Sequence, residues 1–254
     1  MAKVKAKATT TKSKAERVTH LGKVLVVRGG WAGHEPFPFS DRLVPWLKKR
    51  GFQVVVSDTL DAYTDPKIMT DLKLIVPLWT MGEISGEQSK GLIDAVRSGV
   101  NLAGWHGGMC DAFRNNTEYQ FMTGGQWVAH PGGVIDYMVD DLDPVDPITS
   151  DLAPFWMHSE QYYMHTDPGN EVLAWTTFSG EHQGYTWIKD TKMPVVWKRM
   201  WGKGRVFYTS LGHVATDWDV PQAFEIAKRG IQWAAGIEII PEYTDPVCND
   251  CLPF

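Results

Sequence analysis

The stretch Val100–Cys110, with the sequence VNLAGWHGGMC, decides the fold that we expect. Its apolar run ends abruptly in Gly104-Trp105-His106-Gly107-Gly108, which is the pattern of a buried strand, a sharp turn and the start of a helix. Small residues around one reactive residue match the spacing G-x-(nucleophile)-x-G, in which the tight turn raises one side chain above the edge of the sheet. The raised side chain here is His106, which can transfer a proton or bind a metal. Alternatively, the glycines only make the turn and His106 caps it.

The chain before this stretch alternates apolar runs with amphipathic helices. We expect buried strands over residues 23–28, 52–57, 72–77 and 100–103, and helices from Ser40 or Asp41 to Arg50 and over 85–98. Such alternation predicts a doubly wound, mostly parallel α/β sheet. Ligands bind at the carboxyl ends of the strands in such sheets. The loops that carry His34, Trp79 and His106 are therefore expected to share one crevice.

The pattern after Cys110 is less regular. Residues 124–131 look like a loop that contains His130, and strands are predicted over 133–139, 172–178, 184–188, 195–200 and 205–211. The strands 172–178, 184–188 and 195–200 look antiparallel. The strand 205–211 ends at Gly212-His213, and a last helix is predicted from Pro221 to Ala235. We expect one α/β domain with additional antiparallel strands.

Four polar residues occur in the same kind of place, at a strand end or in a glycine-rich loop. They are His34, His106, Glu160 and His213. Three imidazoles and a carboxylate are a common catalytic zinc set. The sequence has no local metal signature such as H-E-x-x-H, so convergence of the four depends on the fold. The alternative is a metal-free polar pocket in which His106 and Glu160 act as acid and base.

Tryptophan is abundant, with 12 residues in the chain, and several fall in the predicted mouth loops. These are Trp31, Trp79, Trp105 and Trp127. Large flat rings that are partly polar suit a ligand with apolar and hydroxyl faces, such as a sugar.

Composition excludes several classes of partner. A net charge of −5 and the lack of a recurring basic stripe argue against nucleic-acid and membrane-surface binding. No apolar run approaches the roughly 20 residues that span a bilayer. The basic residues 1–22 are predicted to be a disordered tail. Three cysteines do not make a disulfide framework, so we expect a cytoplasmic protein, and we expect no metal or redox role for Cys248-Asn-Asp-Cys251.

Several of these residues together resemble a known family. They are His34-Glu35, the Gly104-x-His106 turn, Gly124-Gly125 with His130-Pro131, Ser159-Glu160-Gln161-Tyr162, and 202–208 leading to Gly212-His213. The chain is similar to the ThuA-like, trehalose-utilisation family of the class I glutamine amidotransferase-like superfamily. The resemblance implies a flavodoxin-like sheet, a domain over 23–238 followed by a tail over 239–254, and a disaccharide or its keto-derivative as substrate. Ser159 replaces the usual aspartate of the family, which leaves Glu160 as the carboxylate there.

The resemblance also bears on the chemistry. Amidotransferases of this superfamily use a cysteine at the elbow, where this chain has His106, and Cys110 is expected to point into the core. Without a thiolate the acyl-enzyme route has no nucleophile, so the chain is not expected to be a glutamine amidotransferase. We expect a sugar hydrolase, lyase or isomerase instead.

In the expected mechanism, a divalent metal, with zinc favoured, is held by some of His34, His106 and His213. Glu160 is the base, and the substrate side is formed by Trp31, Trp79, His130 and Tyr162. Two alternatives are a non-catalytic sugar-binding or regulatory domain and a hydrolase that uses Cys110. A homo-oligomer is the default expectation for assembly.

Overall fold

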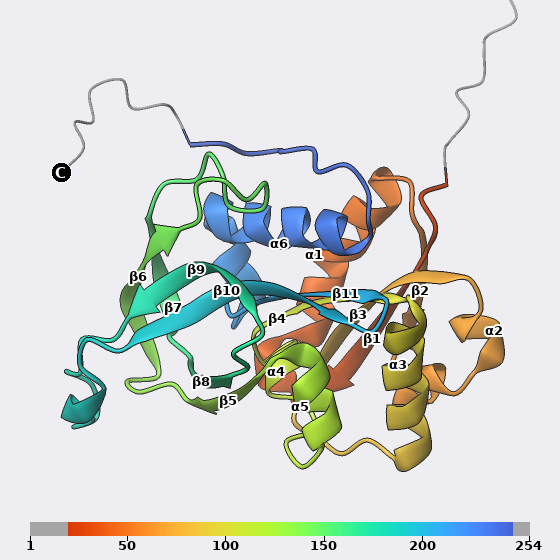
Figure 1. The fold of residues 1–254 in the computed structure, drawn as a ribbon, viewed down its shortest axis with the longest axis horizontal. Coiled ribbons are helices and arrows are strands. Elements are labelled where there is room, and N and C mark those ends of the chain that lie inside the picture. Colours follow the sequence, from red (N-terminus) through yellow and green to blue (C-terminus); the bar gives the residue numbers. More distant parts are fainter. Residues whose placement is uncertain (1–19, 246–254) are drawn as a thin grey trace, which may run out of the picture.

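The computed structural model describes residues 20–245. Within them a nine-stranded mixed sheet lies between two layers of helices (Figure 1). The predicted disordered tail over 1–22 falls mostly outside the described residues, as do Cys248 and Cys251. The sheet has the order β2-β1-β3-β4-β11-β10-β9-β6-β7. Its strands are β1 Lys23–Gly30, β2 Gln53–Ser57, β3 Leu72–Thr80, β4 Asn101–Trp105, β6 Val134–Leu142, β7 Phe155–Glu160, β9 Glu171–Thr177, β10 Lys192–Trp201 and β11 Gly204–Thr209.

The sheet has a parallel half and an antiparallel half. Strand β1 pairs in parallel with β2 and β3, and β4 pairs in parallel with β3 and β11. From β11 onward the pairs β11–β10, β10–β9, β9–β6 and β6–β7 are antiparallel. A small antiparallel pair, β5 Gly125–Ala129 with β8 Tyr163–Thr166, lies beside the main sheet. The predicted fold class, a mostly parallel α/β sheet with additional antiparallel strands, is confirmed.

Helices cover both faces of the parallel half (Figure 1). One face carries α1 Pro36–Lys49 and α6 Pro221–Ala234; the other carries α3 Gly86–Ser98, α4 His106–Cys110 and α5 Thr117–Thr123. Successive residues of β1 point to opposite faces, so Val24 and Val26 pack into one buried core and Leu25 and Val27 into the other. The remaining short elements are α2 Pro66–Met69, η1 Ala32–His34, η2 Leu60–Tyr63, η3 Thr186–Ile188 and η4 Ala215–Asp219.

Three local predictions were wrong. Helix α1 begins at Pro36 and not at Ser40 or Asp41, because proline is favoured in the first helical turn, and Ser40 is buried inside the helix. The expected strand 184–188 is a loop that contains η3, and Gly184 has a φ of 75°. The expected loop 124–131 contains the strand β5. Its partner strand, β8, comes much later in the sequence.

The elbow after β4 has the predicted strand–turn–helix geometry. His106 has a φ of 46°, in the left-handed region, at the first residue of α4. Gly107 leaves room for the imidazole of His34, because a Cβ on Gly107 would lie 2.3 Å from that ring. The glycine is therefore required by the close approach of two histidines.

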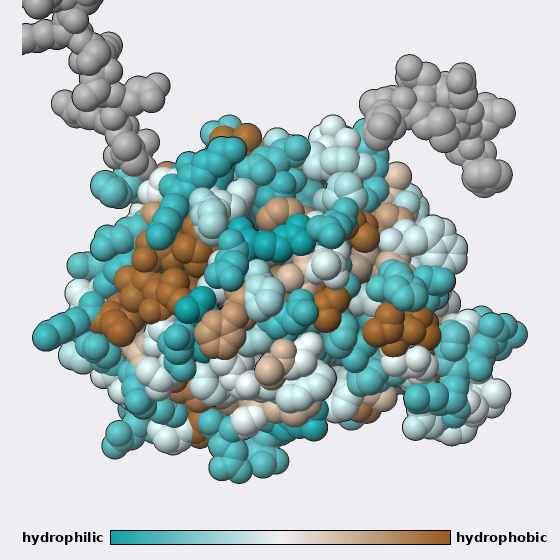
Figure 2. Space-filling view, turned by 180° about the vertical axis from the view of Figure 1, so that it is seen from behind, coloured by the Kyte–Doolittle hydropathy of each residue, from teal (hydrophilic) through white to brown (hydrophobic). Residues whose placement is uncertain are grey.

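The surface is mixed in polarity. Figure 2 shows a mostly hydrophilic face on which apolar side chains gather in a few patches. Among residues 20–245, none of the helices has the length and apolar character needed to cross a bilayer.

Candidate metal centre

Four side chains meet at the carboxyl edge of the parallel strands. His34 lies in the turn after β1, His106 follows β4, His213 follows β11, and Glu160 is the last residue of β7. One donor atom from each of the four lies within 4.8 Å of the other three. The structure thus brings together the four residues that the sequence singled out, while their chemical roles stay predictions.

A single oxygen of Glu160 is the centre of this cluster. Its Oε2 lies 3.1 Å from His213 Nδ1, 3.2 Å from His106 Nε2 and 3.7 Å from His34 Nε2. Its Oε1 lies 3.7 Å from His130 Nδ1. One carboxylate oxygen therefore faces three imidazoles, and the other faces the fourth.

The tautomer of His106 follows from its surroundings. Its Nδ1 lies 2.9 Å from the carbonyl oxygen of Ser210, and a carbonyl can only accept, so this nitrogen carries the hydrogen. Burial lowers the pKa of His106 to about 3, although contact with Glu160 acts in the opposite direction. The neutral imidazole therefore turns the lone pair of Nε2 toward Glu160.

Glu160 is ionised. Burial by itself would raise the pKa of its carboxyl group, but the contacts with His106, His213 and His34 outweigh burial and hold the pKa far below its usual range. His106 Nε2 and Glu160 Oε2 lie 3.2 Å apart, so a proton or a metal cation between them would offset the charge of the carboxylate.

The donor set fits a divalent metal. In tetrahedral zinc sites with bonds of about 2.0–2.1 Å, neighbouring ligand atoms are about 3.3–3.4 Å apart. The separations of 3.1, 3.2 and 3.7 Å around Glu160 Oε2 bracket that value. Imidazole nitrogen and carboxylate oxygen are both common zinc ligands.

Sequence reasoning missed the residues that orient this cluster. Thr80 Oγ1 lies 3.0 Å from His34 Nδ1. Asp217 Oδ2 accepts hydrogen bonds from Ser159 Oγ at 2.6 Å and from the backbone N–H of His213 at 2.8 Å. Asp217 therefore ties the end of β7 to the loop after β11. The available signals were the position of Thr80 at the end of a buried strand and the closeness of Asp217 to His213 in sequence.

The predicted substrate residues are distributed unevenly. Trp31, 46% exposed, packs edge-on against His34 with ring centroids 4.7 Å apart, and half-buried His130 faces Glu160. Tyr162 is buried and stacks on His106 at 3.8 Å. Of the residues predicted to bind the substrate, Trp31 and His130 are thus the two that lie on the outer side of the cluster.

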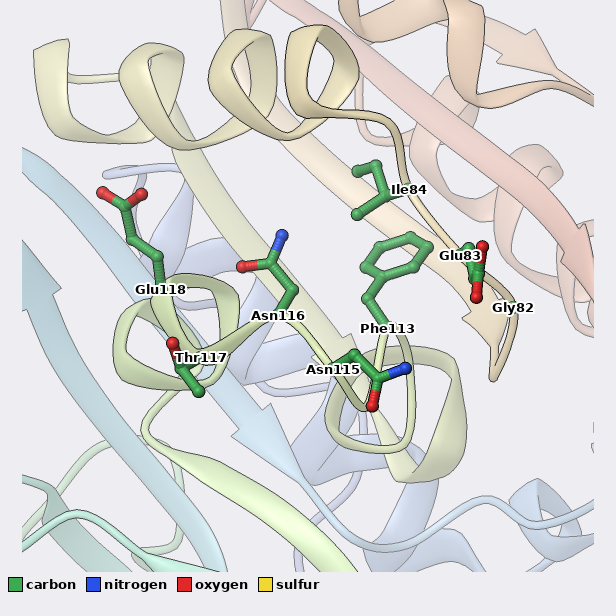
Figure 3. A pocket seen from close by; sticks show the side chains of 8 residues that line it. All are labelled: Gly82, Glu83, Ile84, Phe113, Asn115, Asn116, Thr117 and Glu118. Carbon is green, nitrogen blue, oxygen red and sulfur yellow. The ribbon is translucent and has the colours of Figure 1, made fainter.

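Two tryptophans from the predicted mouth loops lie elsewhere. The ring of Trp79 lies against Gly29 and Gly82. Gly82 and the start of α5 line a cavity of about 330 Å³, and Trp79 is not among its lining residues (Figure 3). Trp105 is buried in the core with Trp218. Successive side chains of β4 point to opposite faces of the sheet, so the side chain of Trp105, just before the elbow, points away from the surface.

Cys110 is buried, as expected, and burial raises the pKa of its thiol well above the usual range. The protein therefore holds no thiolate at this position.

Comparisons with known proteins agree with this fold. Residues 23–234 match the family model described as ThuA, trehalose utilisation. A ThuA-like protein from Bacteroides uniformis has a TM-score of 0.67 and 17% identity, covering 87% of this chain and 95% of that one. A ThuA-like protein from Parabacteroides merdae also has a TM-score of 0.67, with 16% identity and coverage of 89% and 93%.

A larger protein has a similar region. The β-galactosidase of Bacillus circulans has a TM-score of 0.54 and 12% identity, over 87% of this chain and 32% of its own. At such identities these structures show the fold alone. No curated protein matches the chain.

Proposed function

The chain belongs to the ThuA, trehalose-utilisation family, and from that premise we propose that it is a carbohydrate-processing enzyme that works with a divalent metal. One observation carries the proposal: one donor atom from each of His34, His106, His213 and Glu160 lies within 4.8 Å of the other three. Three imidazoles that converge in this way can hold a divalent cation, with Glu160 beside it. Zinc is favoured because imidazole is one of its usual ligands.

The proposed substrate is a disaccharide or its keto-derivative. The family description supplies the link to trehalose. The exposed ring of Trp31 next to His34 offers a flat surface for the apolar face of a sugar, and His130 offers a polar contact. The bound metal would polarise a carbonyl group or activate water.

The chain also supplies an acid–base group beside these imidazoles. Glu160 can accept a proton from a bound sugar, which suits hydrolysis, elimination or isomerisation. Glutamine amidotransfer does not fit, because His106 occupies the elbow and Cys110 is a buried thiol.

Elemental analysis tests the metal first. Untagged protein purified without chelator is expected to contain close to one divalent metal per chain, and His106→Ala is expected to lose it. His158→Ala is the matched control, because this exposed histidine pairs with Asp136 on the surface. A screen of disaccharides and keto-sugars then tests the substrate, and Glu160→Gln is expected to abolish any turnover found.

A protein without metal would overturn the proposed mechanism. Metal-free catalysis by His106 and Glu160 and a sugar-binding domain without catalysis would then be the remaining readings. The cytoplasmic location and the homo-oligomer stay predictions from the sequence.

A further inference from the structure

A row of side chains leads away from the four-residue cluster on the side of His130. The ring of Trp127 lies next to His130, with ring centroids 5.6 Å apart, and near Tyr162, at 6.2 Å. The guanidinium carbon of Arg114 lies 4.5 Å from the centroid of the Trp127 ring. Because His130 Nδ1 is itself 3.7 Å from Glu160 Oε1, Arg114 is separated from that carboxylate by two rings.

Arg114 is fixed along one edge of its guanidinium group. Its Nε and Nη2 donate hydrogen bonds to the two carboxylate oxygens of Asp111 at 2.6 and 2.8 Å. Asp111 is buried, and a bidentate pair of this kind orients the plane of the guanidinium. Nη1 makes no hydrogen bond to any residue that the structure describes, and the side chain of Arg114 is 42% exposed. An oriented cation therefore keeps one edge free for a ligand.

A second arginine shows what a fully paired guanidinium looks like in this chain. Arg97 also lies over a tryptophan, with its guanidinium carbon 5.8 Å from the ring centroid of Trp201. Its Nη1 donates to Asp94 and its Nη2 donates to Glu118, each at 2.7 Å. Arg97 thus uses both Nη groups on carboxylates of the chain, whereas Arg114 uses one.

Two further donors lie beside Arg114. Trp127 Nε1 is buried without a hydrogen-bond partner among residues 20–245, and an indole N–H can only donate. Burial raises the pKa of Tyr162 well above its usual range, and the charge of nearby Arg114 acts in the opposite direction. The hydroxyl of Tyr162 therefore keeps its hydrogen. These groups complement a ligand that is rich in hydrogen-bond acceptors.

The charges of this region favour an anion among such ligands. Asp111 and Arg114 form a pair that is neutral overall. A divalent metal at the histidines would outweigh the single negative charge of Glu160, because a bound cation is the largest local charge in its site. The region between the histidines and Arg114 is then positive. A carboxylate is a group that the planar edge of a guanidinium binds well.

We infer that Nη1 of Arg114 binds a carboxylate of the substrate, so that the preferred substrate is an acidic disaccharide. The inference rests on the proposed function, which it makes more specific. One sugar unit lies at the histidines, and the second unit, which carries the carboxylate, extends past His130 and Trp127 to Arg114. Arg114 determines specificity and takes no part in the chemical step, because two rings separate it from Glu160.

Calorimetric titration of the full chain with two matched sugars tests this inference. The sugars are trehalose and the carboxylic acid made from it by oxidising one hydroxymethyl group. Wild type with zinc added is expected to bind the acid about tenfold or more tightly than trehalose, because the acid gains a charge-assisted hydrogen bond. Added salt is expected to reduce this preference, since Arg114 is partly exposed.

Substitutions at Arg114 are expected to remove the preference and to leave the affinity for trehalose within about twofold. Arg114→Gln lacks the charge, and Arg114→Lys keeps the charge without the planar edge, so its preference is expected to be intermediate. Arg97→Gln is the matched control and is expected to keep the full preference, because Arg97 is paired elsewhere on the surface. If Arg114→Gln does not melt cooperatively, the double variant Asp111→Asn, Arg114→Gln removes both charges of the pair.

The outcomes separate this inference from the proposed function. If wild type binds both sugars equally, or if folded Arg114→Gln or the double variant keeps the preference for the acid, only the inference is wrong. If wild type binds neither sugar, the carbohydrate function is wrong and the role of Arg114 falls with it. A preference that depends on Arg114 and persists in chelator-treated protein would support the carboxylate site and leave the metal to elemental analysis.

Discussion

The proton on His106 Nδ1 sets the electrostatics of the cluster. Because the Ser210 carbonyl holds it there, and because burial keeps the second nitrogen unprotonated, His106 is neutral in the folded state. In the unfolded chain the same side chain has an ordinary pKa of about 6.5. Folding therefore releases a proton from His106 in mildly acidic solution.

This difference predicts acid sensitivity of the metal-free protein. As the pH falls from about 6.5 toward 3, the unfolded chain binds a proton at His106 and the native protein does not, so the free energy of unfolding decreases. The slope from this one group is at most about 1.4 kcal/mol per pH unit. Glu160, whose pKa is lowered from 4.5, adds to the loss only at lower pH.

Urea unfolding of chelator-treated protein between pH values of about 5 and 7 measures this slope. His106→Gln lacks the titrating group and is expected to show a shallower pH dependence than wild type. Equal slopes for the two proteins would show that His106 titrates alike in both states.

Cys110 yields a second prediction for a single residue. Its thiol is buried and its pKa is raised, so alkylation by iodoacetamide is expected to be slow in the native protein and fast in urea. Peptide mapping by mass spectrometry follows this residue alone. Rapid native modification of Cys110 with loss of activity would favour the alternative of a hydrolase that uses Cys110.

The elbow between β4 and α4 makes a prediction about an element. Gly107→Ala would place a Cβ 2.3 Å from the ring of His34 and is expected to displace this histidine, which lowers zinc affinity about ten- to a hundredfold with all four donors present. Gly108→Ala is the matched control, since its Cβ would make an ordinary contact at 3.4 Å with Leu78. Zinc titration of both variants measures the difference. Similar affinities would mean that the ring of His34 can move without cost.

Local signals explain which elements could be predicted. Strands β1, β3 and β4 are continuous apolar runs. Helix α3 carries residues that mark both of its ends, and at its start Ser85 and Gln88 form a capping box. Strand β5 carries no such signal, because its conformation depends on pairing with β8 some forty residues away.

Topology explains how far the site could be predicted. The parallel order of β1, β4 and β11 brings His34, His106 and His213 to one edge. The alternation of strands and helices predicts this for His34 and His106, whereas His213 follows a strand that the pattern does not assign to the parallel part. Glu160 lies on β7, an antiparallel strand at the far end of the sheet order. The sequence marks Glu160 by its position and by the family resemblance, but it does not predict the strand pairing that brings Glu160 to the histidines. The contact between Ser159 and Asp217 that brings β7 to the cluster is a tertiary interaction without a local pattern.

The C-terminal segment shows that the folded unit extends beyond the family match at residue 234. Glu242 accepts hydrogen bonds from Trp46 Nε1 at 2.8 Å and from Lys228 Nζ at 3.0 Å, and its backbone N–H donates to buried Glu225 at 2.9 Å. The segment thereby joins α1 to α6 from outside the sheet. Glu242, in the segment that the sequence assigns to a C-terminal tail, thus packs against α1 and α6.

Glu242→Ala is accordingly expected to lower the free energy of unfolding by about 1–3 kcal/mol, the cost of leaving a hydrogen-bonding group without its partner. The loss arises because Trp46 Nε1 and the ammonium group of Lys228 each lose an acceptor in a partly buried position. Glu238→Ala is the matched control, since Glu238 is exposed in the same segment. Urea unfolding compares both variants with wild type. If both leave the midpoint unchanged, the segment lies on the domain without stabilising it, and the stable unit ends near residue 236.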